Sequence, residues 1–138
     1  MIQELISIIK SANPYYVIHF EESSMMNIKV DEIDESESFC YIEEYTESRY
    51  FKEGYVKKKS TRVQIYFCKF TELHNDAIKR ECLRSEIESE IVKPFMAKYN
   101  ESTVFKKVDN FTCRSILPRF NANEISLMLE FDIIQTIC

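Results

Sequence analysis

Glycine is almost missing from this sequence, because Gly54 is the only one in 138 residues. Phosphate-binding loops and dinucleotide fingerprints need several glycines, since the backbone must approach the phosphate groups closely. The sequence contains neither motif, and it has no G-x-S-x-G nucleophile turn. These absences exclude the commonest nucleotide-binding loops and the α/β-hydrolase nucleophile.

A basic excess and a long apolar run are also missing. The formal net charge of −5 leaves no surplus of positive charge to neutralise nucleic-acid phosphates. No run reaches the ~18 apolar residues that a transmembrane helix needs. The first segment, MIQELISIIK, lacks the basic leader and the long apolar core of an export signal. We therefore expect no specific nucleic-acid ligand, no membrane and a cytoplasmic location.

Close pairs of metal-binding residues are missing as well. The five cysteines lie at positions 40, 68, 82, 113 and 138, and the series Cys68, His74, Cys82 has no pair spaced for zinc. Cys68 fits the apolar pattern of a strand, so we expect a buried thiol there. Without an export signal, the cysteines are expected to be reduced.

One pair of carboxylates shares a strand face. Glu130 and Asp132 could bind a metal only with a third ligand, so we expect a solvated strand face instead. The sequence therefore predicts no cofactor, no metal and no catalytic residue. A metal-dependent nuclease using these carboxylates, or a hydrolase using Cys68 or Cys82, remains the least favoured alternative.

The apolar periodicity that is present predicts a single α+β domain over residues 1–138. Its sheet is mostly antiparallel, with a short N-terminal helix at 2–10 and one long helix at 72–99 packed on one face. The last strand is the clearest, because Ile125, Leu127, Leu129, Phe131 and Ile133 alternate with polar positions. The other predicted strands, from their apolar content, lie at 15–20, 25–33, 39–47, 62–70, 103–108 and 111–120.

The segments between these elements carry the other signals. The run DEIDESE at 31–37 is acidic, and Thr71, Asn75 and Asp76 are possible N-caps of the long helix. Residues 48–60, SRYFKEGYVKKKS, surround the single glycine with charged and aromatic side chains. This composition favours a projecting β-hairpin whose tip buries little against its own domain.

The long helix carries two apolar stripes. Leu83, Ile87, Ile91 and Phe95 recur at a spacing of four and should pack on the sheet. A second, narrower stripe lies nearly opposite and consists of Ile78, Cys82, Ser85, Ser89, Val92 and Met96. Pro94 should kink or stop the helix near its end. The second stripe is covered either by the same chain or by another subunit, and the sequence leaves both readings open.

The element order resembles that of small tail-completion proteins of tailed bacteriophages, most closely the tail-terminator and minor-tail group, and of related prophage proteins. The segments that carry the resemblance are TRVQIYFCKF, CLRSEIESEIVKPFMAKY and PRFNANEISLMLEFDI. The resemblance implies a non-enzymatic structural protein that forms a homo-oligomeric ring and contacts tail-tube or neck proteins. It would act in the bacterial cytoplasm and in the virion.

In that reading, the subunit interface combines the second helix stripe with the hairpin aromatics Tyr50, Phe51 and Tyr55. We expect Lys57, Lys58 and Lys59 to point outward or against acidic residues of a neighbour. A small α+β protein-binding module with an unknown partner is the main alternative.

Overall fold

The computed structural model describes residues 1–13, 17–21, 38–43, 47–70, 77–108, 110–116 and 124–137. Four predicted features lie outside these ranges: the strand at 25–33, the acidic run at 31–37, His74, and the N-caps at Thr71, Asn75 and Asp76.

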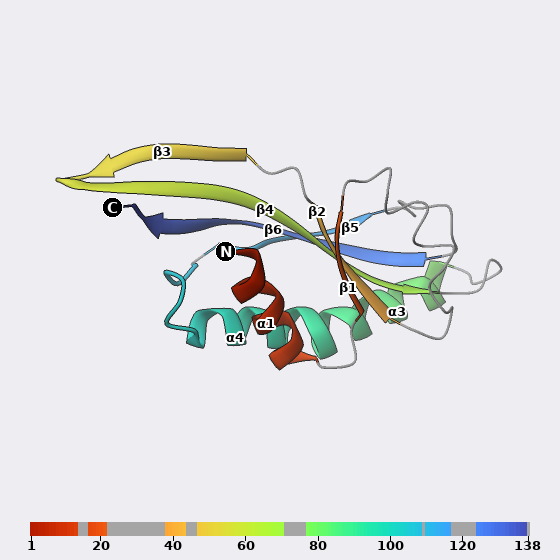
Figure 1. Ribbon diagram of the computed structural model, residues 1–138. Coiled ribbons are helices and arrows are strands. Elements are labelled where there is room, and N and C mark those ends of the chain that lie inside the picture. The colour runs from red at the N-terminus through yellow and green to blue at the C-terminus, as the bar shows by residue number, and fades with distance from the viewer. Residues whose placement is uncertain are drawn as a thin grey trace.

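The fold is α+β, as predicted, with a mostly antiparallel sheet and its helices gathered on one face (Figure 1). The strand order is β1-β2-β4-β6-β5, and β3 also pairs with β4. Only β1 and β2 run parallel among the pairs of described strands. The strands are β1 (Val17–Glu21), β2 (Ser38–Glu43), β3 (Glu47–Glu53), β4 (Val56–Phe70), β5 (Thr112–Ile116) and β6 (Glu124–Thr136). The strand predicted at 103–108 is wrong, because this segment connects α4 to β5 without pairing in the sheet.

The helical layer begins with α1 (Ile2–Ala12), which starts where the sequence predicts. Its buried residues are Leu5, Ile8 and Ile9, which share one side of the helix. The long helix consists of α3 (Ala77–Ile87), a π-helical turn η1 (Glu88–Val92) and α4 (Lys93–Glu101).

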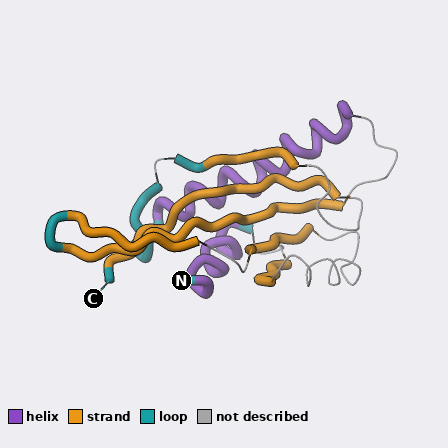
Figure 2. The backbone as a smooth tube through the Cα atoms, turned by 90° about the horizontal axis from the view of Figure 1, so that it is seen from above, coloured by secondary structure: helices purple, strands orange, loops and turns teal. Residues whose placement is uncertain are grey.

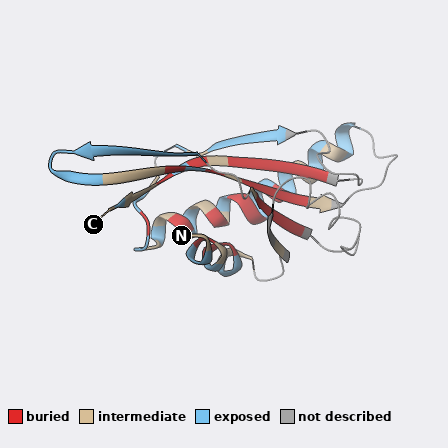
Figure 3. Cartoon of the chain, turned by 45° about the horizontal axis from the view of Figure 1, so that its top comes forward, coloured by how far each residue is buried: buried red, intermediate tan, exposed pale blue. Residues whose placement is uncertain are grey.

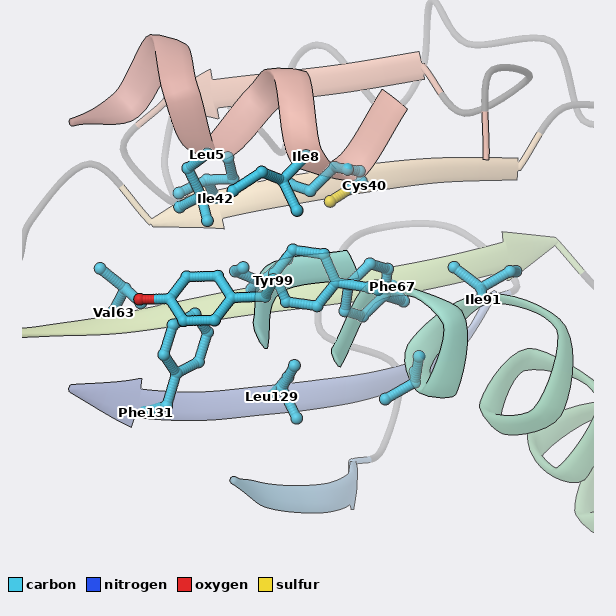
Figure 4. Close-up of a cluster of buried hydrophobic side chains, with 14 of the residues drawn as sticks. Leu5, Ile8, Cys40, Ile42, Val63, Phe67, Ile91, Tyr99, Leu129 and Phe131 are labelled. Carbon is cyan, nitrogen blue, oxygen red and sulfur yellow. The ribbon is translucent and has the colours of Figure 1, made fainter. Parts of the chain in front are cut away.

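The core lies between this layer and the inner face of the sheet. Val63, Ile65 and Phe67 of β4 point toward the helices, and Leu129 and Phe131 of β6 join them (Figure 4). Ile125, Leu127 and Ile133 belong to the same buried cluster, so the set of inward-facing residues predicted for the last strand is confirmed. Ser126 and Met128 on the opposite face are buried too. Burying one side chain of this size stabilises the fold by roughly 2–3 kcal/mol.

The outer face of the sheet is also buried along part of its length. Tyr66 and Cys68 of β4 point away from the helices and are nevertheless buried, as predicted for a strand that is apolar on both faces. Tyr41 of β2 stacks on Tyr66 with ring centroids 5.3 Å apart. Ser126 of β6 donates its hydroxyl proton to Cys68 Sγ at 3.2 Å.

The helix continues past Pro94 instead of stopping there. Pro94 lies in the first turn of α4, and the helix runs on to Glu101. The Lys93 N–H bonds to the Glu88 carbonyl, five residues back, which widens the turn just before the proline. A proline has no N–H to donate and its ring crowds the preceding turn, so the expected disturbance takes the form of this wider turn.

Candidate interaction surface

The hairpin of β3 and β4 projects beyond the helical layer, and we call residues 48–60 the arm (Figures 1 and 2). Glu53 pairs with Val56, so Gly54 and Tyr55 form the two-residue connection. Gly54 has φ +63°, which a residue without a Cβ adopts at no steric cost. The end of β6 runs beside β4 as far as Lys58, so part of the arm is three-stranded.

The arm exposes its large side chains. Every residue of β3 is exposed, in contrast to the described residues of β2 and the second half of β4, which are mostly buried (Figure 3). Tyr50 retains 71% of its accessible surface and Tyr55 retains 104%, while Phe51 and Val56 are also exposed. A hollow of about 250 Å³ lies at this part of the molecule, lined by Tyr50, Phe51, Lys52, Lys57, Lys58 and Ile137.

The arm is positively charged. Lys58 forms an ion pair and hydrogen bond with Glu53, and this contact lowers the pKa of the Glu53 carboxyl. Lys59 Nζ lies 5.8 Å from the centroid of the Tyr50 ring, within cation–π range. Lys52 and Lys57 have no ion-pair partner among the described residues. The expectation that the three successive lysines point outward or toward a neighbour remains a prediction.

The structure divides the second helix stripe into two parts. Ile78 retains 77% of its accessible surface, and Cys82, Ser85 and Ser89 are exposed too. Val92 is fully buried by its own chain, so it is not available for the subunit contact expected of it. Met96 is partly buried and packs against the same core.

The π-helical turn explains why Val92 changes sides. A regular α-helix completes a turn in 3.6 residues, so residues spaced by four drift steadily around it. The wider turn at η1 removes this drift and keeps Ile87, Ile91 and Phe95 on the side facing the sheet. The same rotation carries Val92 from the outer stripe into the core.

The carboxylates of Glu130 and Asp132 lie on the outer face of β6 and each has a protein partner. Gln64 Nε2 donates to Glu130 Oε2 at 2.7 Å, and Arg62 Nε donates to Asp132 Oδ1 at 3.3 Å. This hydrogen bond and the nearby negative charges raise the pKa of Arg62. No group of three metal-ligating side chains forms within the described ranges.

The cysteine candidates Cys68 and Cys82 do not form a site among the described residues. Cys68 is buried in the sheet, whereas Cys82 is exposed on α3. Cys40 is buried beneath α1, and this burial raises the pKa of its thiol. His74 lies outside the described ranges.

Sequence reasoning missed two exposed residues, Val56 and Glu90. Val56 extends the aromatic surface of the arm, and its position directly after the turn was the available signal. Glu90 follows Ser89 on η1, and Glu88, which the sequence places beside the second stripe, precedes it. Both carboxylates are exposed and form no ion pair with any described residue.

The sequence matches no protein-family model and no curated protein.

Within the described residues, no helix is both long enough and apolar enough to cross a membrane.

Proposed function

We propose that this chain is a non-enzymatic structural subunit that assembles with copies of itself, in the manner of the phage tail-terminator and neck proteins that it resembles. The observation that carries the proposal is the arm, which holds Tyr50 and Tyr55 exposed and outside the core. Tyrosine is enriched at protein interfaces, because its ring buries a large apolar area while its hydroxyl stays hydrogen-bonded.

The arm contributes little to the core of its own domain. Its aromatic side chains are absent from the buried cluster, which draws on α1, η1, α4 and the inner face of the sheet. A protruding element of this kind gains its apolar contacts from another molecule. In the proposed assembly, the arm supplies these contacts between neighbouring subunits of a ring.

The test replaces both arm tyrosines, Tyr50→Ser and Tyr55→Ser, and measures mass by light scattering across a range of concentrations. The wild type should form an oligomer, and the arm variant should dissociate at concentrations at which the wild type remains assembled. Val104→Ser is the matched control, because Val104 is an exposed apolar residue outside the arm. A wild type that stays monomeric at high concentration, with tail-tube protein present, would overturn the proposal.

A small protein-binding module is the second candidate, favoured by the exposed edge strand β5. This strand ends the strand order, and its side chains from Thr112 to Ser115 are exposed. An extended peptide can add to such an edge through backbone hydrogen bonds. This module would remain a monomer or dimer by mass and would take up a partner at β5, leaving the arm tyrosines without effect.

A further inference from the structure

We propose that the arm of one copy docks on the exposed side of α3 and η1 of the next copy, which joins subunits head to tail. This inference rests on the proposed function and adds the surface that receives the arm.

The two surfaces lie at opposite ends of the same strand. The arm lies at the start of β4, while Lys69, near the end of β4, has its Nζ 3.8 Å from Glu86 Oε2 of α3. The 15 residues of β4 span about 50 Å at the usual rise per residue. Figure 1 shows the arm and α3 at the two ends of the molecule. One chain therefore cannot bring its own arm onto its own α3, whereas successive copies can.

The charges of the two surfaces are complementary. Five Lys and Arg residues and one Glu give the arm a charge of +4, so the other residues together carry −9. Residues 77–92, which form α3 and η1, hold four Glu residues and three Lys or Arg residues, a net charge of −1. The negative charge lies in the second half of this surface, where residues 86–90 hold three Glu residues and no basic residue. Glu88 and Glu90 are exposed there without an ion-pair partner among the described residues, as Lys52 and Lys57 are in the arm. Opposite potentials of this kind orient two partners and favour their encounter.

The apolar side chains also match. Tyr50 and Tyr55 project from the arm, and Ile78 projects from the first turn of α3. The exposed positions that follow Ile78 along the helix, Cys82, Ser85 and Ser89, are small and leave room for an aromatic ring. The hollow of about 250 Å³ beside Tyr50 has room for an apolar side chain such as that of Ile78.

Two other partners for the arm fit less well. A symmetric contact between two arms would bring one set of lysines against another, and like charges at an interface are costly. A nucleic acid would be attracted by the arm but repelled by the charge of −9 on the remainder of the chain. A second copy of this chain offers the arm the acidic residues at 86–90 and, at the start of α3, the exposed Ile78.

A disulfide tests the geometry directly. The variant Tyr55→Cys is made with Cys113→Ser and Cys138→Ser, so that Cys82 is the one remaining exposed thiol within the described residues. Mild oxidation should then link the introduced thiol of one copy to Cys82 of the next. Because each copy carries both thiols, denaturing gels without reductant should show a ladder of dimers, trimers and higher species.

The control adds Cys82→Ser to the same background. The ladder should then disappear, and at most a dimer linked through the two introduced thiols should remain. A dimer as the only product, unaffected by Cys82→Ser, would overturn the head-to-tail contact. Monomers alone on the gel, with an oligomer by light scattering, would overturn this contact but leave the proposed function standing. A monomer by both methods would overturn both.

A charge exchange provides a second test that needs no new cysteine. Lys57→Glu should weaken assembly about tenfold, since it places a negative charge against Glu88. Adding Glu88→Lys in the same chain should restore most of the loss. If the double variant assembles no better than Lys57→Glu alone, the acidic residues of η1 do not receive the arm, and the head-to-tail contact proposed here is overturned.

Discussion

At the scale of single residues, the ring and the hydroxyl of Tyr99 have opposite effects on the stability of the fold. The ring is fully buried, stacks on Phe105 with centroids 5.4 Å apart, and meets Phe131 edge-on at 5.0 Å. Its hydroxyl has no hydrogen-bond partner among the described residues. Burial accordingly raises the pKa of this phenol. Aromatic packing stabilises the core here, while an unpaired hydroxyl costs roughly 1–3 kcal/mol.

Tyr99→Phe should therefore stabilise the protein, by about 1 kcal/mol in urea unfolding, because it removes the unpaired hydroxyl and keeps the ring. Tyr41→Phe is the matched control, since the Tyr41 hydroxyl donates to Glu43 Oε2 at 2.7 Å. That substitution should destabilise the protein by about 1 kcal/mol. Equal losses in the two variants would show that the Tyr99 hydroxyl is hydrogen-bonded.

Cys40 makes stability depend on pH in the alkaline range. Its burial raises the pKa of the thiol above the ordinary value of a cysteine, so the folded state keeps the proton that the unfolded state releases. The contribution of Cys40 to stability is then constant below the unfolded pKa of about 8.5 and falls as pH rises above it, by about 1.4 kcal/mol per pH unit. Cys40→Ala should reduce this slope between pH 9 and 10, whatever its effect on stability at neutral pH. A Cys40→Ala variant with the wild-type slope would show that another group causes the alkaline loss.

At the scale of elements, the sequence predicts which residues are buried wherever a helix or strand keeps one regular apolar period. The inward-facing residues of β6, the start of α1 and the burial of Cys68 all follow from such periods and are confirmed. The burial of Val92 could not be predicted in this way, because a π-helical turn turns this residue toward the core. A regular helical period does not include such a turn. The parallel pairing of β1 and β2 could not be predicted from the sequence either, since it depends on contacts between segments that lie apart in the chain.

A pair of deletions tests the role of the π-helical turn. Deleting Ser89 should convert η1 into regular α-helix while Ile87 and Phe95 keep facing the sheet, so the loss of stability should be small, about 1 kcal/mol. Deleting Ala97 rotates Tyr99 away from Phe95 and out of the core, at a cost of roughly 3–5 kcal/mol. Ser89 and Ala97 are both exposed, so the loss of either side chain should itself cost little stability. A difference between the two deletions therefore reports the rotation of the helix.

Urea unfolding followed by circular dichroism compares the two deletions. Equal losses of stability would show that the extra residue of η1 is required for the packing of the helix and is not simply accommodated by it.

At the scale of the whole molecule, the residues that stabilise the fold and the residues proposed to contact a neighbour lie in different places. The core lies under the helices, whereas the exposed aromatic residues and an excess of positive charge lie in an arm at one end. The sequence predicts this arm from its one glycine, yet it cannot show that α3 lies at the opposite end of the sheet. That separation is what makes a head-to-tail contact between copies possible.

The mass of the wild-type chain in solution tests this account most directly. Light scattering from micromolar to millimolar concentration should show multiples of 16.5 kDa, and assembly should weaken in high salt because the contact is partly electrostatic. A constant mass of 16.5 kDa over the whole range, at low salt and with tail-tube protein added, would contradict it.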